Sequence, residues 1–179
     1  MKNKHTLLPL LLLLCVSALI LSGAVYASEE SEVRGTVQRV FQQLKSRDYS
    51  ALYDSLPSSS RNRMSRERFT NALKRAQEMY VLDRMDVGPV RLANNLAVVD
   101  TVLYGRLVMP IETEGKIVVQ QYLVREDGKW RVATGDTGTT KRFLANNPAF
   151  ARRFPIKQPR VYVKQNGNWT EFTPPRAVR

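Results

Sequence analysis

The sequence predicts an α+β domain whose N-terminal helices pack on an antiparallel sheet. Apolar residues recur at three- and four-residue intervals up to Met79, which is the spacing of one helix face. Beyond Tyr80, apolar and polar residues alternate, as they do along strands with one buried side. Because turn signals rather than helices separate these strands, we expect an antiparallel meander covered by helices on one face.

Three helices are expected in the first half of the chain. Ser31 is a suitable N-cap for the first helix. A short second helix ends at Pro57, because proline lacks the N–H that a helix interior needs. Residues 58–63 are then expected to form a loop, and Ser65 to cap the third helix.

Four strands are expected to come after the helices. They cover residues 81–92, 96–107, 116–126 and 129–133. Gly88-Pro89 indicates a bulge or an edge position in the first strand, because proline cannot donate to a strand ladder. Asp127-Gly128 is typical of a tight hairpin turn and separates the last two strands.

These turns also predict a strand register. Symmetric pairing of the second and third strands about Ile111 places Asp100 opposite Tyr122. One sheet face then collects apolar residues and is expected to receive the helices, with Trp130 in the core against the first helix. The other face is apolar around a polar centre made of Asp100, Tyr104, Gln120 and Tyr122.

Two stretches of the chain carry a resemblance to a known family. Residues 40–49 read VFQQLKSRDY before a short helix, and residues 126–132 read EDGKWRV at the end of the meander. Together with three N-terminal helices, they resemble the nuclear transport factor 2-like (cystatin-like) superfamily over residues 32–135. The resemblance implies a cone-shaped domain in which a curved sheet wraps round a long helix. Some members are ketosteroid isomerases, polyketide cyclases or dehydratases, and many exported members have no known catalysis.

Residues 138–179 lie beyond this resemblance and carry most of the net positive charge. They hold nine basic residues and one acid, whereas residues 28–137 hold 17 basic and 15 acidic residues. A helical turn or two, a short helix opened by Pro148 and a C-terminal hairpin are expected here. The candidates for binding an anionic surface are Lys141, Arg142, Arg152, Arg153, Lys157, Arg160 and Lys164. The alternative is that these cations only keep the segment soluble.

A second basic group crowds the start of the third helix. It consists of Arg61, Arg63, Arg66 and Arg68. Such a group either binds an anion or is simply solvated, and solvation is the commoner outcome.

The first 27 residues have the three-part order of a secretory signal peptide. Two lysines precede an apolar run, and small residues come after it up to Ala27. The alternative is an uncleaved membrane anchor, because residues 6–27 are long enough to span a bilayer, which takes roughly 20 apolar residues. Either interpretation places the rest of the chain outside the cytoplasm, in the periplasm or beyond. The expected division is therefore residues 1–27, an α+β domain over 28–137 and a basic extension over 138–179.

Removal of the signal segment also removes the only histidine, His5, and the only cysteine, Cys15. Histidine bases, thiolate nucleophiles and zinc sites built from these residues are then absent, so we expect no metal and no cofactor. The weak catalytic candidates are Asp100, Tyr104, Gln120 and Tyr122. By the resemblance, Asp100 would accept a proton in a ketosteroid-isomerase-like pocket. Otherwise Asp100 only accepts a hydrogen bond, or this face is a dimer seam.

The sequence therefore predicts an exported, non-catalytic binding or interaction module at the cell envelope. The alternative is a small isomerase, cyclase or dehydratase that uses Asp100 with Tyr104 and Tyr122. An envelope protein, an anionic surface, a small apolar ligand or a second copy of the chain are the expected partners, and nucleic acid is not, because of the compartment. A deep apolar cavity that reaches Asp100 favours the enzyme, and a closed cone favours the module.

Overall fold

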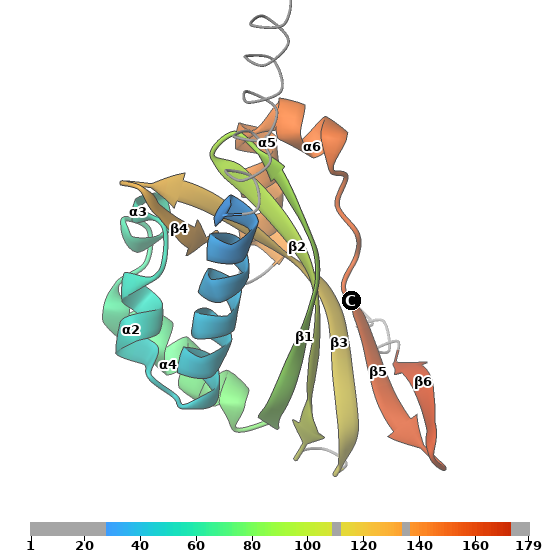
Figure 1. Ribbon diagram of the computed structural model, residues 1–179. Helices are drawn as coiled ribbons and strands as arrows, with labels where there is room; N and C mark the ends of the chain where they lie inside the picture. The colour runs from blue at the N-terminus through green and yellow to red at the C-terminus, as the bar shows by residue number, and fades with distance from the viewer. Residues whose placement is uncertain (1–27, 109–111, 134–136, 173–179) are drawn as a thin grey trace, which may run out of the picture.

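The computed structural model describes residues 28–108, 112–133 and 137–172. It confirms the α+β class, because helices come first and a six-stranded antiparallel sheet curves round them (Figure 1). The segment expected to be a signal peptide or anchor, residues 1–27, lies outside the described residues. Within the described ranges, no helix is both long and apolar enough to cross a membrane.

The helical layer has four elements. They are the N-terminal helix, residues 28–45, with α2 (Tyr49–Asp54), α3 (Ser58–Arg61) and α4 (Arg66–Gln77). The cap expected at Ser65 is confirmed, because its side chain accepts a hydrogen bond from the backbone N–H of Arg68 at 3.3 Å. Gln77 ties the layer together, since its amide accepts from Tyr49 Oη and donates to the carbonyl of Leu44.

Two expectations about these helices were wrong. Ser31 is not an N-cap, because the first helix already includes residues 28–30. The expected loop over residues 58–63 begins instead with α3. Pro57 precedes it with a fixed φ of −57°, and the backbone N–H of Ser58 donates to the carboxylate of Glu126 at 2.9 Å. These two constraints favour a helical turn that serine propensity alone does not predict.

The sheet has the order β1-β2-β3-β5-β6, and β4 pairs with β3. Its strands are β1 (Tyr80–Ala93), β2 (Leu96–Leu107), β3 (Thr113–Glu126), β4 (Lys129–Val132), β5 (Arg160–Gln165) and β6 (Asn168–Phe172). The bulge and the edge position indicated by Gly88-Pro89 are both confirmed, because β1 ends the strand order and its register shifts between Val87 and Val90. The tight turn is confirmed by the positive φ angles of Asp127 and Gly128, 50° and 72°.

The register of β2 and β3 differs by two residues from the expected one. Asp100 lies opposite Gln120 rather than Tyr122. The pairing continues to Thr113 because β5 pairs with β3 from Gly115 onward, so tertiary contacts override the weak strand propensity of glycine and glutamate. A shift of two residues keeps every side chain on its face, so the predicted faces are right. The expected centre of symmetry, Ile111, lies outside the described residues.

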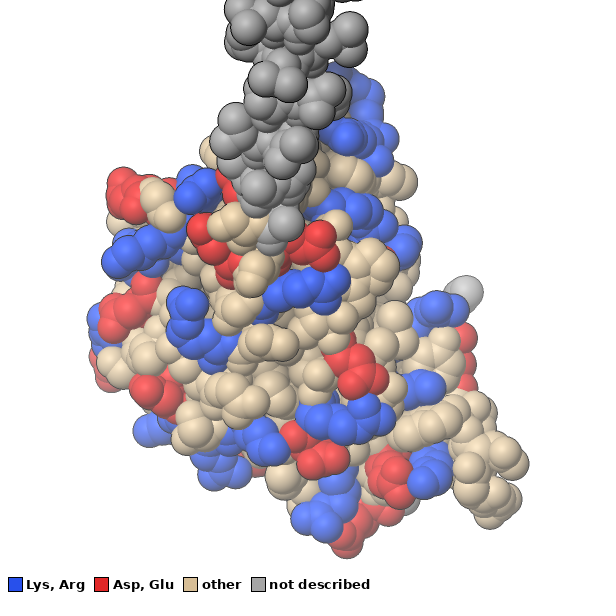
Figure 2. All heavy atoms as spheres, viewed as in Figure 1, with Lys and Arg blue, Asp and Glu red and all other residues tan. Residues whose placement is uncertain are grey.

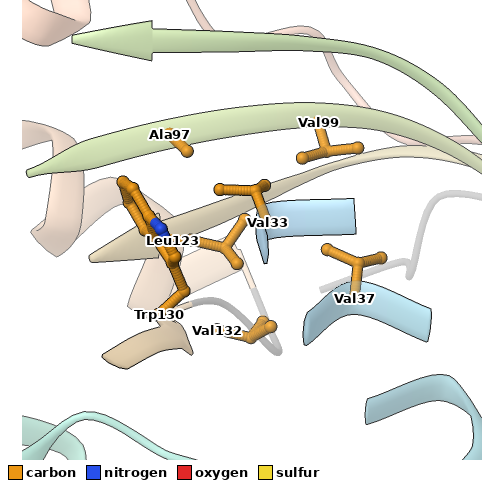
Figure 3. Close-up of a cluster of buried hydrophobic side chains, with 7 residues drawn as sticks. All are labelled: Val33, Val37, Ala97, Val99, Leu123, Trp130 and Val132. Carbon is orange, nitrogen blue, oxygen red and sulfur yellow. The ribbon is translucent and has the colours of Figure 1, made fainter. Parts of the chain in front are cut away.

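The N-terminal helix packs on the expected sheet face. Trp130 is only 5% exposed and belongs to the core there, as predicted. The full cluster, drawn in Figure 3, is Val33, Val37, Ala97, Val99, Leu123, Trp130 and Val132. It joins helix and sheet near the ends of β2 and β3 where the β4 hairpin closes.

The opposite face is partly covered by the chain's own C-terminal segment. Helices α5 (Thr137–Asn146) and α6 (Pro148–Arg153) bring Leu144 and Phe150 onto Val98 and Tyr122. The hairpin β5–β6 then extends the sheet beyond β3 (Figure 1). The boundary expected after residue 137 therefore falls at the first turn of α5, and the segment beyond it belongs to the sheet and its cover.

Candidate binding site

Asp100 lies in a network of cations and amides on this second sheet face. Its Oδ1 accepts hydrogen bonds from Arg91 at 2.8 Å and from the Gln120 amide at 3.2 Å, and Lys157 Nζ lies 3.3 Å from Oδ2. The hydroxyl of Tyr122 donates to Gln120 Oε1 at 2.9 Å. Gln120 therefore links Asp100 to Tyr122, and three of the four catalytic candidates meet.

The network keeps Asp100 ionised. Partial burial raises the pKa of this carboxyl, but hydrogen bonds from Gln120 and Lys157 and the charge of Arg91 lower it by more, so the pKa lies below its usual value. Burial raises the pKa of Tyr122. Asp100 is consequently a weak base, and its oxygens are already occupied.

Tyr104, the fourth candidate, belongs to a different set of contacts. The guanidinium of Arg84 lies 3.6 Å from the centre of its ring, and the ring meets Trp169 edge-on with centroids 6.4 Å apart. Four strand residues span about 13 Å, so the shared face does not bring Tyr104 to Asp100.

A large apolar cavity lies between the helical layer and the first sheet face. Its volume is about 510 Å³. Phe41, Phe69 and Leu73 line its helical side, and Leu103 and Ile117 line its sheet side. Sequence reasoning placed these residues on helix and sheet faces but left open whether a cavity lies between them.

The cavity exists because the core fills only part of the cone. Ala97 and Val99 are fully buried against the N-terminal helix, whereas Leu103 is half-buried and Ile117 is 38% exposed. Apolar alternation is the same along both halves of the face, so the sequence carries no signal for where the helices cease to touch the sheet.

One end of the cavity is polar. Its lining there includes Gln120, Tyr122 and Lys157 but, among the described residues, neither Asp100 nor Tyr104. This end lies where β3 changes partners, since β4 pairs with residues 123–126 and β5 with residues 115–118. The cavity thus reaches the network around Asp100 without including its carboxylate.

The cations expected to bind an anionic surface are divided among several elements. Lys157 pairs with Asp100, and Lys164 pairs with Glu114 at 2.9 Å. Arg153 and Arg160 lie over the rings of Phe154 and Tyr162 at 5.2 and 5.9 Å. Arg142 reaches the Thr139 hydroxyl at 3.5 Å, and Lys141 and Arg152 are exposed.

Cations and acids are interspersed over most of the visible surface in Figure 2, whereas blue groups without red ones among them lie at the upper right. Arg66, from the basic group at the start of α4, likewise pairs with Asp54. Among the described residues, no group of three or more acids, histidines or cysteines is arranged to hold a metal ion. The apolar cavity is therefore the most developed candidate site.

Comparisons with known proteins do not assign this chain to a family. A scan against protein-family models finds no match, and a search of the curated proteins finds no significant relative. The function is therefore argued from the geometry of the cavity and its surroundings.

Proposed function

We propose that this chain is an exported, non-catalytic binding protein of the cell envelope whose cavity holds a small apolar ligand. The observation that carries the proposal is the cavity of about 510 Å³ with walls that are mainly apolar. Ligand pockets in proteins commonly measure roughly 300–1,000 Å³ and are lined by apolar side chains with a few polar groups. A helix held against a curved sheet also agrees with the nuclear transport factor 2-like resemblance, which we include in the proposal.

The surroundings of Asp100 favour binding over catalysis. A general base works best when its pKa is close to the operating pH and its oxygen can reach the substrate. The pKa of Asp100 is lowered instead, and Arg91, Gln120 and Lys157 occupy its oxygens. Its absence from the described cavity lining points the same way.

Export is tested by the mass of the protein purified from its native compartment. Cleavage after Ala27 leaves a chain that begins at Ser28 and has 152 residues, from 179 − 27. A mass that matches this chain supports a cleaved signal peptide. A mass that includes residues 1–27 indicates a retained anchor, and recovery from the cytoplasm contradicts export.

Ligand binding is tested with 1-dodecanol, an uncharged apolar probe, by isothermal titration calorimetry. We expect saturable binding of one molecule per chain. Leu103→Trp should weaken it by narrowing the cavity, because Leu103 is one of its walls. Val102→Trp adds a similar volume at the neighbouring, half-buried position on the opposite sheet face and serves as the matched control.

Two results would contradict the proposed function. One is the absence of saturable dodecanol binding by the folded protein. The other is equal binding by Leu103→Trp and the unchanged protein, with melting curves that show both folded, since binding would then occur elsewhere.

A further inference from the structure

A second, smaller hollow adjoins the apolar cavity and has a different chemistry. It has a volume of about 160 Å³ and lies between α3, the β1–β2 turn and α5. That volume is several times the roughly 30 Å³ that one water molecule occupies in the liquid. We call it the polar cleft, because hydroxyl, amide and guanidinium groups make up most of its lining.

Hydrogen-bond donors from several elements line the polar cleft. Arg63 comes from the connection between α3 and α4, and Arg142 comes from α5. The side chains of Ser59, Ser60 and Asn146 have no hydrogen-bond partner within the described part of the chain. Because a guanidinium presents several N–H groups in a planar fork, two of them in one cleft suit an oxyanion.

The acid in the cleft does not cancel this charge. Glu126 is the carboxylate among the described lining residues. Its Oε2 accepts a hydrogen bond from the backbone N–H of Ser58 at 2.9 Å and lies 3.7 Å from Nε of Arg131. Glu126 is therefore already compensated by neighbouring groups, and Arg63 and Arg142 leave the described lining of the cleft positive.

The polar cleft and the apolar cavity share a wall of small residues. Ser60, Ala133 and Thr139 line both hollows. An apolar chamber beside a cationic one, with small side chains as the described residues between them, matches a molecule that has an apolar tail and a negative head.

We propose that the two hollows form one site for an anionic amphiphile. Its carboxylate, phosphate or sulfate head lies in the polar cleft against Arg63 and Arg142, and its tail lies in the apolar cavity. This inference rests on the proposed function, because the tail occupies the same cavity. It assigns the ligand class. It also gives Arg63 a binding role, whereas an arginine that is simply solvated has none.

The test compares probes with one tail and different heads on the full chain. Dodecyl phosphate should bind about tenfold or more tightly than 1-dodecanol, because hydrogen bonds to charged groups exceed neutral ones in strength. Arg63→Gln and Arg142→Gln should each remove about tenfold of the affinity for dodecyl phosphate and leave that for dodecanol unchanged. Arg75→Gln is the control, because Arg75 is exposed near the end of α4 and lines neither hollow.

The outcomes separate this inference from the proposed function. Equal affinities for dodecanol and dodecyl phosphate, or arginine variants that behave like Arg75→Gln, overturn the shared site and leave the apolar cavity function standing. Failure of every probe to bind overturns both. Inorganic phosphate that binds as tightly as dodecyl phosphate also overturns the shared site. If laurate competes with dodecyl phosphate, and its affinity falls equally in Arg63→Gln and Arg142→Gln, the shared site is supported and a carboxylate is shown to serve as the head.

Discussion

Replacing Trp130 tests the packing that closes the narrow end of the cone. Trp130 is buried among valines and a leucine from the N-terminal helix, β2, β3 and β4 (Figure 3). Deleting a large buried aromatic side chain costs about 3–5 kcal/mol. The indole N–H is buried and, among the described residues, has no hydrogen-bond partner, which already costs the native state about 1–3 kcal/mol. Because Trp130→Ala also removes that donor, we expect a loss near the lower limit, about 3 kcal/mol.

Trp130→Phe separates the two contributions. It keeps an aromatic ring and removes the unpaired donor, so it should cost less than about 1.5 kcal/mol. Urea unfolding measures both variants, and an unchanged slope would show that only native stability differs. A loss below about 1 kcal/mol for Trp130→Ala would place it among ordinary surface substitutions and refute the packing.

Three further substitutions test the sheet, the N-terminal helix and the Asp100 network. Gly105→Ala should lower the free energy of unfolding by about 1–3 kcal/mol, because the new Cβ would clash with the carbonyl oxygen of Val81. Gly35→Ala, in a helix with open space around that position, should raise it by about 0.5–1 kcal/mol, and equal melting temperatures for the two variants would contradict this contrast. Asp100→Asn should destabilise the protein at pH 7, and this cost should begin to shrink below the unfolded pKa of about 3.9 and disappear only below the lowered folded pKa. A carboxyl with a lowered pKa contributes stability above its unfolded value of about 3.9 and loses it as the pH falls through the folded value. A cost that stays unchanged as the pH falls from about 5 to about 2 would contradict the ionised network.

Local signals were sufficient for most of the fold. The alternation of β2 and the pair Asp127-Gly128 predicted a strand and a turn that the structure confirms. These features depend on neighbouring residues only. The register of β3 was predicted less well, because β5, about 45 residues away in sequence, supplies the partner that extends it to Thr113.

The candidate site was harder to predict because it depends on distances between elements. The alternation of side chains along a strand placed Asp100 and Tyr104 on one face correctly. Alternation does not indicate how far apart two residues lie along that strand. The cations that occupy Asp100 come from β1 and from the segment before β5, which no local pattern connects to it. Whether an apolar cavity exists could not be decided from the sequence, because Leu103 has the same alternation as the buried Val99.

Intermolecular nuclear Overhauser effects would locate bound dodecanol most directly. Leu73 and Leu103 lie on opposite walls of the cavity. We expect nuclear Overhauser effects between the dodecanol protons, from its terminal methyl group or its chain, and the methyl groups of both Leu73 and Leu103. Effects confined to Val81 and Val108, which are 45% and 44% exposed and do not line the cavity, would mean that the ligand binds an outer surface and would contradict the cavity as the binding site.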